Sequence, residues 1–173
     1  FLIAGRALWF YIGKFIWPSP LIFTYPMWEI DASVWWQYLY PATFLLLILL
    51  LWILRKKIGR GPLTAILFFA GTILPALGFF NIYYMRFSLV SDHFPYLASI
   101  GILLIAVVGV ARLTGKNLPA FAILLLLALG HLTWKQIPIY KNDFTLWSDT
   151  VQKNPNAWMA QYNLGNVFIA EQK

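Results

Sequence analysis

The sequence predicts an all-α protein in which several membrane-spanning helices are followed by a polar tail of paired helices. Three features support this: 61% of the 173 residues are hydrophobic, only 11% are charged, and long windows lack any charge. A soluble domain carries about 25% charged residues. A disordered chain holds few aromatic residues, whereas this one has nine Trp, nine Tyr and fourteen Phe. Both classes are therefore excluded, and an integral membrane protein in contact with a lipid bilayer is expected.

The charge-free windows predict four spans. We expect them at about residues 35–54, 63–84, 96–111 and 118–134. A helix needs about 20 residues to cross a hydrocarbon core about 30 Å thick. Pro75 lies within the second span and is expected to kink it, because proline removes a backbone donor. The predicted domains are a transmembrane part, residues 1–134, and a non-cytoplasmic helical tail, residues 135–173.

Residues 1–17 allow two interpretations. Arg6 and Lys14 lie on one side of a helical wheel and bulky apolar residues occupy much of the rest. This pattern is typical of an amphipathic helix that lies in the membrane interface. It equally fits the end of a partial span, with Arg6 facing a polar interior. Because the chain starts at Phe1 and its tail stops without a closing signal, we expect a segment of a longer protein.

Positive charge in two loops predicts the orientation. Residues 55–60 hold four Lys or Arg and residues 112–116 hold two, with no acid in either loop. Short loops rich in Lys and Arg stay on the cytoplasmic side of a membrane. The tail is therefore expected on the opposite face, which is the periplasmic side of a bacterial inner membrane. In a membrane protein the placement of these charges matters more than their sum of +7, and no nucleic-acid partner is expected.

The tail has the spacing of a tetratricopeptide (TPR) boundary. Trp147 precedes Pro155 by eight residues, and Leu164, Gly165 and Phe168 follow at the positions of the next first helix. We expect these five residues to pack together, with Gly165 permitting a close approach of the helices. A TPR solenoid needs about three or more repeats, so the truncated tail either continues or packs on the membrane domain. A generic amphipathic helix pair is the alternative.

One polar stretch, residues 81–96, is the candidate binding site. It holds Arg86, Asp92 and His93, which we expect to converge at the outer ends of the second and third spans. Arg86 suits phosphate oxygens because the guanidinium is a planar fork. The alternative is that Arg86 pairs with Asp92, while His93 and Tyr96 cap helix ends or contact lipid headgroups. No catalytic motif is complete, and neither a metal site nor a cofactor is predicted.

The order of three stretches resembles a known family. These are AGRALWFYIGKFIWPSPLIFTYPMWEID at 4–31, GFFNIYYMRFSLVSDHFPYLASIG at 78–101 and LWSDTVQKNPNAWMAQYNLGN at 146–166. They resemble the membrane-to-repeat half of bacterial TPR-containing membrane proteins. Those proteins are similar to the transmembrane and TPR-containing O-mannosyltransferases of animals.

The resemblance implies a GT-C type glycosyltransferase that takes a sugar from a polyprenyl-phosphate carrier. The family's catalytic acid lies in an external loop outside this segment, so no catalytic residue is expected here. Asp92 and Tyr96 match the family's outer loop, while His93 stands where relatives often have Arg. Arg86, Asp92 and His93 would border the carrier phosphate, and the tail would present an acceptor or a partner protein. Whether the chain is an enzyme stays open; the alternative is a non-catalytic membrane anchor, scaffold or accessory subunit of a larger membrane complex.

Overall fold

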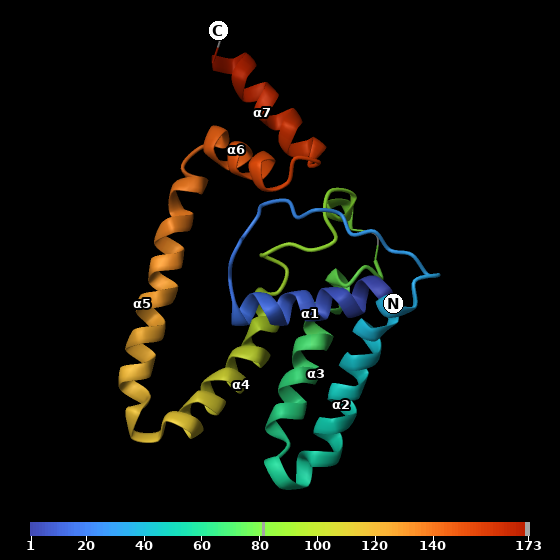
Figure 1. Ribbon diagram of the computed structural model, residues 1–173, viewed down its shortest axis with the longest axis vertical. Helices are drawn as coiled ribbons and strands as arrows, with labels where there is room; N and C mark the ends of the chain where they lie inside the picture. The colour runs from blue at the N-terminus through green and yellow to red at the C-terminus, as the bar shows by residue number, and fades with distance from the viewer. Residues whose placement is uncertain (81, 172–173) are drawn as a thin grey trace.

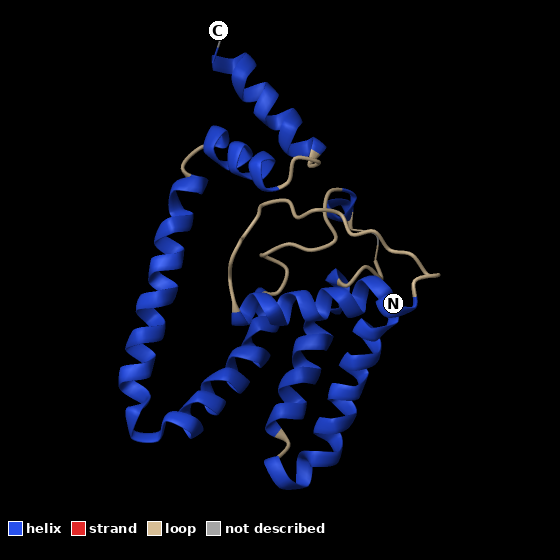
Figure 2. Cartoon of the chain, in the orientation of Figure 1, coloured by secondary structure: helices blue, strands red, loops and turns tan. Residues whose placement is uncertain are grey.

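The computed structural model is all-helical in the residues it describes, 1–80 and 82–171, where it has no strand (Figures 1 and 2). The α-helices are Leu2–Ile16 (α1), Leu39–Ile58 (α2), Gly61–Ile73 (α3), Tyr96–Thr114 (α4), Leu118–Gln136 (α5), Asp143–Lys153 (α6) and Trp158–Glu171 (α7). The 3₁₀ turns are Trp35–Tyr38 (η1), Leu74–Ala76 (η2), Tyr83–Arg86 (η3), Gly115–Asn117 (η4) and Ile137–Tyr140 (η5). The prediction of an all-α fold is confirmed. Residue 81, in the predicted second span, and residues 172–173, in the predicted tail, lie outside the described residues.

Two continuous helical stretches are long and apolar enough to cross a membrane. They are Trp35–Ile58, which joins η1 to α2, and Tyr96–Tyr140, which runs from α4 to η5. The second stretch reverses direction at η4, where Gly115 has a φ of 50°, and so forms two separate helices (Figure 1). The α2–α3 and α4–α5 turns, both rich in Lys and Arg, lie at the same end of the molecule, which we call the basic end.

The second predicted span is wrong in its extent. The apolar helix ends with η2 at Ala76 rather than continuing to residue 84. Pro75 was expected to kink this helix, but the α-helix ends just before it, at Ile73. The chain then turns away at Gly78, which has a φ of 87°. Residues 79–80 and 82–95 therefore form irregular segments, the second of which carries η3.

Helix α1 lies across the ends of α2, α3 and α4 that are opposite the basic end (Figure 1). Its backbone at Gly5 is so close to Pro41 that an added Cβ would overlap the Pro41 backbone nitrogen. The Trp9 indole donates a hydrogen bond to the Tyr40 carbonyl, 3.1 Å. The ring of Phe15 lies 6.3 Å from that of Phe69 in α3, which is fully buried. We call α1 the platform helix, because the remaining outer segments lie on it.

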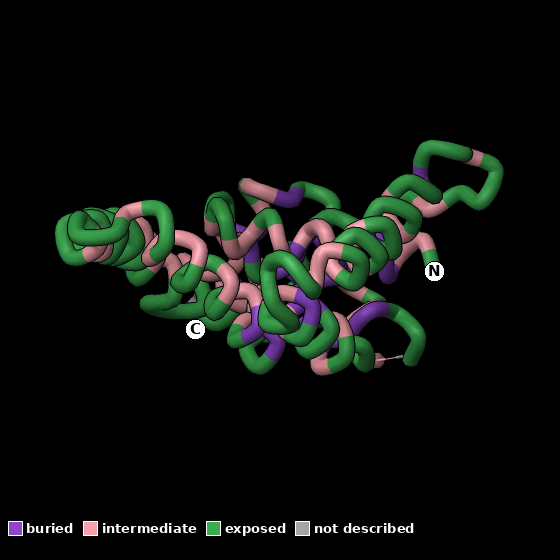
Figure 3. The backbone as a smooth tube through the Cα atoms, turned by 90° about the horizontal axis from the view of Figure 1, so that it is seen from below, coloured by how far each residue is buried: buried purple, intermediate pink, exposed green. Residues whose placement is uncertain are grey.

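The core cluster joins the platform helix to α2, α3 and α4 and also includes Ile22, Tyr25 and Val90 from irregular segments. Figure 3 shows the buried positions along the backbone in purple. The largest fully buried side chains of the core include Tyr11, Phe69 and Ile73. In contrast, α5 contains no buried residue. Large apolar side chains on α2, α4 and α5 are exposed; Leu45, Val107 and Leu126 are 65%, 62% and 68% exposed.

The tail is a pair of helices, α6 and α7, joined at Asn154–Ala157. Asn142 caps α6: its side chain accepts from the Thr145 backbone N–H at 2.9 Å. Two expectations for the TPR positions are wrong. Gly165 makes no close approach, because a Cβ there would meet no atom within 4 Å. Phe168 is 48% exposed and contacts the Phe144 ring rather than Trp147.

The closest approach of α3 and α4 yields a first prediction. A Cβ on Gly101 would overlap the carbonyl oxygen of Ala65, whereas a Cβ on Gly109 in the same helix would meet nothing within 4 Å. Gly101→Ala should lower the free energy of unfolding by about 1–3 kcal/mol, because the backbones of α3 and α4 would have to move apart to make room for the methyl group. Unfolding in mixed detergent micelles measures this. Gly109→Ala is the control and should be neutral or slightly stabilising; equal effects of the two variants would contradict the packing.

Candidate functional site

The polar residues gather where two irregular segments cross the platform helix. We call residues 17–34 and 82–95 the outer loops; they lie on the side of α1 away from α2–α4 (Figure 1). Their central polar contact joins them: the Tyr25 hydroxyl donates to Asp92 Oδ1 at 2.8 Å. Tyr25 itself is 4% exposed. The segment that contains the predicted site is therefore fixed by a residue 67 positions earlier in the chain.

Burial makes the ionised form of Asp92 less favourable than it is in water. It raises the pKa of this carboxyl above its ordinary value, while the Tyr25 hydrogen bond and the positive charges of Lys14 and Lys153 lower it in part. Burial and the neighbouring Asp92 charge also raise the pKa of the Tyr25 hydroxyl. Tyr25 therefore stays a hydrogen-bond donor at neutral pH, and Asp92 is its acceptor.

A second contact ties the outer loops to the platform helix. The Tyr11 hydroxyl, on α1, accepts a hydrogen bond from the Ser91 backbone N–H at 3.1 Å. The Ser91 hydroxyl lies 2.7 Å from His93 Nδ1, within hydrogen-bond distance. Tyr11 is 1% exposed and Ser91 is 3% exposed. Asp92 and His93 thus follow a buried serine whose backbone α1 holds in place.

Lys14 extends from the platform helix toward the first outer loop. Its ammonium donates to the Pro20 carbonyl and lies 5.3 Å from the centre of the Tyr25 ring. At the other half of α1, the Arg6 guanidinium lies 4.6 Å from the Trp28 ring centre. Both cations of α1 therefore face aromatic rings of the first outer loop, which is a favourable arrangement for a cation.

The tail is docked on the first outer loop. The Asn154 amide donates to the Thr24 carbonyl at 3.0 Å, and Lys153 Nζ donates to the Leu21 carbonyl at 3.1 Å. The Phe23 ring meets Trp147 edge to face, with centroids 5.2 Å apart. Trp147, expected to pack inside a repeat, instead packs on Phe23 of the first outer loop. Backbone carbonyls of an irregular segment thereby gain donors from the tail.

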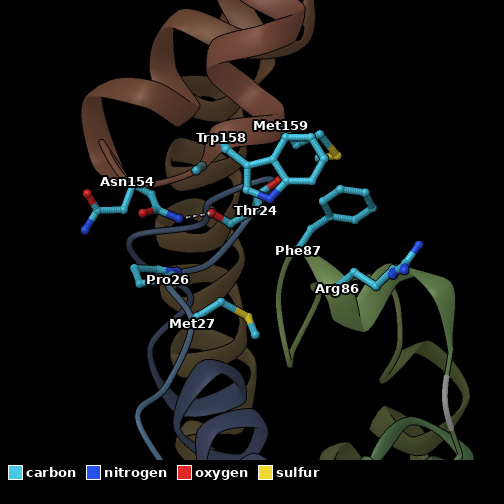
Figure 4. A pocket seen from close by; sticks show the side chains of 10 residues that line it. Thr24, Pro26, Met27, Arg86, Phe87, Asn154, Trp158 and Met159 are labelled. Atoms are coloured by element: carbon cyan, nitrogen blue, oxygen red, sulfur yellow. Dashed lines mark hydrogen bonds between the residues drawn. The ribbon is translucent and has the colours of Figure 1, made fainter.

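A pocket of about 150 Å³ lies at this junction (Figure 4). It is lined by the first outer loop, by η3 and by the α6–α7 turn, through Thr24, Pro26, Met27, Arg86, Phe87, Asn154, Asn156, Ala157, Trp158 and Met159. The Phe87 and Trp158 rings lie 5.1 Å apart. Thr24 is 1% exposed. Its hydroxyl is fully buried and has no hydrogen-bond partner among the described residues, while the Tyr84 hydroxyl donates to the carbonyl of the preceding residue, Phe23. One residue of the pocket lining therefore has a buried polar group without a partner.

The predicted site residues fall in two places. Asp92 and His93 belong to the contacts around Ser91, whereas Arg86 is exposed at the rim of the junction pocket, with its guanidinium 5.6 Å from the Tyr83 ring centre. The alternative pairing of Arg86 with Asp92 is absent: within the described side chains the ion pair present is Lys153–Asp149, 2.7 Å. Tyr96 begins α4 and is 73% exposed.

Sequence reasoning missed the residues that organise both places. No sequence motif marks Tyr11, Thr24 or Tyr25. The hydrogen bond between Tyr25 and Asp92 joins residues 67 positions apart, and no pattern of spacing in the sequence predicts such a contact. Asn154 was the one detectable residue, since an asparagine before Pro155 is typical of a turn. In the part of the chain that the structure describes, no group of three His, Cys, Asp or Glu is placed to hold a metal ion.

Comparisons with known proteins add no function to this geometry. No protein-family model, no curated protein and no solved structure matches the chain. The arrangement can bind an anion at Arg86 and can present hydroxyl and amide groups to a polar ligand.

The raised pKa of Asp92 predicts how stability depends on pH. Between the ordinary value of 3.8 and the raised one, the folded state binds more protons than the unfolded state. The free energy of unfolding should therefore fall as the pH rises through this window. Thermal unfolding in micelles across this range should show the fall in the wild type and not in Asp92→Asn. Tyr25→Phe should extend the fall to higher pH, because that hydrogen bond lowers the pKa. Asp143→Asn is the control; the same slope in Asp92→Asn as in the wild type would refute the assignment.

The docking of the tail predicts a matched pair of asparagine variants. Asn154→Ala should leave the buried Thr24 carbonyl without its donor, at a cost of about 1–3 kcal/mol, and amide hydrogen exchange in α6 and α7 should accelerate. Asn163→Ala removes a side-chain hydrogen bond within α7 only, to the Met159 carbonyl. It should accelerate exchange in α7 alone. Unchanged exchange in Asn154→Ala would show that this contact does not hold the tail.

Proposed function

We propose that this chain is the membrane part of a polyprenyl-phosphate-sugar-dependent protein glycosyltransferase of bacterial inner membranes. In this proposal α2, α3, α4 and α5 span the bilayer and the tail lies on the periplasmic face. The observation that carries the proposal is the junction pocket, which combines the unpartnered Thr24 hydroxyl with Arg86 at its rim.

The exposed apolar helices support the membrane assignment. Soluble monomers rarely expose contiguous apolar patches of more than a few hundred Å², whereas α5 has no buried residue at all. Helices α4 and α5 have 19 residues each, enough for about 28 Å. The shorter α3–η2 segment, Gly61–Ala76, reaches about 24 Å, and α1 with the outer loops lies beyond its end.

The platform helix fits the interfacial interpretation of residues 1–17. It runs across the other helices rather than alongside them, and both of its cations face aromatic rings of the first outer loop. Aromatic and basic side chains are favoured at the level of the lipid headgroups. In this proposal α1 therefore lies in the outer interface, and the junction pocket lies just above it.

The lining of the junction pocket suits a phosphate-linked sugar. Arg86 can hold phosphate oxygens at the rim through paired hydrogen bonds. The exposed Asn156 amide offers donors and acceptors to sugar hydroxyls, and the Trp158 ring, 60% exposed, offers an apolar face. The chain's role in the reaction is to bind and orient the carrier; the catalytic acid would come from sequence outside this segment.

The tail would present the acceptor or a partner protein. Its outward residues include Tyr162 and Ile169, which are 66% and 61% exposed on α7. A TPR array that continues this pair would bind protein along such a surface.

A second candidate function is a non-catalytic anchor or accessory subunit. It is favoured by the docking contacts of Lys153, Asn154 and Trp147, which fix the tail on the first outer loop without using Arg86. Such an anchor would need no affinity for a polyprenyl phosphate. Carrier binding therefore separates the two candidates.

Binding of undecaprenyl phosphate to the purified chain in micelles tests the pocket. Arg86→Ala should weaken binding by about tenfold, because it removes charge-assisted hydrogen bonds. Arg86→Lys should recover only part of it, since a point charge cannot replace the planar fork. Trp158→Ala should leave the affinity for the bare carrier nearly unchanged but weaken that for a sugar-loaded one.

Lys135→Ala, which removes a cation outside the pocket, is the matched control for Arg86→Ala. Equal losses in these two variants, or full recovery in Arg86→Lys, would reduce the effect to general charge attraction. No measurable carrier binding by the wild-type chain would favour the anchor.

Topology gives an independent prediction. The chain has no cysteine, so single cysteines at exposed Ile58 and Asn156 can be labelled selectively in intact cells. A membrane-impermeant maleimide should label Asn156→Cys directly and Ile58→Cys only after permeabilisation, because Lys and Arg loops stay cytoplasmic. The opposite labelling pattern would invert the proposed orientation.

A further inference from the structure

A groove runs between α3 and α4 toward the basic end. Its volume is about 780 Å³, and most of its lining is apolar or small. The lining residues include Gly59, Gly61, Phe68, Gly101, Gly109 and Arg112. Arg112 is the one charged residue among them.

Glycines determine where the groove is closed and where it is open. At Gly101 the helices touch, since an added Cβ would overlap the Ala65 carbonyl oxygen. At Gly59, Gly61 and Gly109 an added Cβ would meet nothing within 4 Å. Figure 1 shows α3 and α4 diverging from their contact toward the basic end. The groove is therefore a wedge, closed near Gly101 and open where the positive charges lie.

The positively charged residues at the open end have no acidic residue near them in the sequence. Arg112 lines the groove, and Arg60 stands between the two lining residues Gly59 and Gly61. No Asp or Glu occurs in residues 32–91 or 93–142. Both guanidinium groups belong to exposed residues and, among the side chains described, neither forms an ion pair.

We propose that this groove binds an anionic glycerophospholipid, with an acyl chain along α3 and α4 and its headgroup phosphate at Arg112. The inference rests on the proposed membrane location and adds a lipid site to it. Three features support it. The groove is apolar along its length, as an acyl chain requires, and Arg112 supplies a positive charge at its open end. In the proposed topology, this open end lies at the membrane surface. Basic pockets between spanning helices on the cytoplasmic side are suited to anionic lipid headgroups.

A protein helix fits this groove less well than a lipid. A helix along the wedge would cover Arg112 and would have to bring its own acid, because an unpaired buried charge is costly. A lipid supplies phosphate and acyl chain in one molecule, and its headgroup remains at the interface. The bidentate geometry of arginine with phosphate adds to the match.

The test measures phosphatidylglycerol retained by the purified full chain. The chain is reconstituted in vesicles of phosphatidylcholine and phosphatidylglycerol, extracted into mild detergent and analysed by native mass spectrometry. Arg112→Gln should reduce retained phosphatidylglycerol by about fivefold through loss of one phosphate contact. Gly109→Leu should reduce it similarly, because the new side chain occupies the space of the acyl chain while leaving every charge in place.

Each variant has a matched control outside the groove. Lys116→Gln removes a charge at the same basic end from a residue that does not line the groove, and Gly71→Leu adds the same side chain at an open position of α3. Both should retain phosphatidylglycerol as the wild type does. Equal losses in Arg112→Gln and Lys116→Gln, or no loss in Gly109→Leu, would overturn the site. Preferential retention of added undecaprenyl phosphate, or of a co-purifying protein in its place, would also overturn it.

The outcome is separable from the proposed function. Cysteine labelling at Ile58 and Asn156 reports insertion and orientation independently of lipid retention. An inserted chain that retains no phosphatidylglycerol refutes this inference alone. Retention that is unchanged in Arg86→Ala, while carrier binding is lost, would show that the two ends of the molecule hold different lipids, as we infer.

Discussion

The outer half of this molecule depends on the crossing of the platform helix over α2, α3 and α4. The backbone of α1 at Gly5 meets Pro41 so closely that no side chain fits between them, and the Phe15 ring meets fully buried Phe69. With α1 in place, the Tyr11 hydroxyl accepts a hydrogen bond from the Ser91 N–H, and this contact fixes the second outer loop against α1. The first outer loop then lies between α1 and the tail, and Tyr25 links it to Asp92.

This layering explains why irregular backbone is tolerated beside helices. The outer loops cannot satisfy their carbonyls by regular secondary structure, so donors come from elsewhere. Lys14, Tyr84, Lys153 and Asn154 all donate to carbonyls of the first outer loop. The tail is thus part of the outer layer, and the junction pocket exists because α6, α7 and η3 meet the same short stretch of chain around Thr24. In our proposal this layer receives a carrier lipid at the outer face, while the α3–α4 groove receives a phospholipid at the basic end.

Much of the helical framework could be predicted because it depends on local composition. Long charge-free windows gave α2, α4 and α5 to within a few residues, and the loop charges indicated which turns share an end. The end of α3 was missed because Pro75 alone is compatible with a kink; Gly78 turns the chain, and its positive φ has no unique sequence signal. Trp147, Gly165 and Phe168 have TPR spacing, but spacing does not reveal that Trp147 meets Phe23 in a distant loop. Asp92 was a candidate from its surroundings, whereas its partner Tyr25 depends on tertiary structure.

The orientation of α1 relative to α2 in a bilayer tests the proposed arrangement most directly. Solid-state NMR of the chain in aligned bilayers, with ¹⁵N at the backbone amides of Trp9 in α1 and Trp52 in α2, reports the direction of each helix. Spanning helices tilt by about 20° from the bilayer normal on average. We predict that the backbone N–H bond of Trp52 lies near the bilayer normal and that of Trp9 near the membrane plane. Both N–H vectors close to the normal would make α1 another span and would contradict the platform on which the outer layer is built.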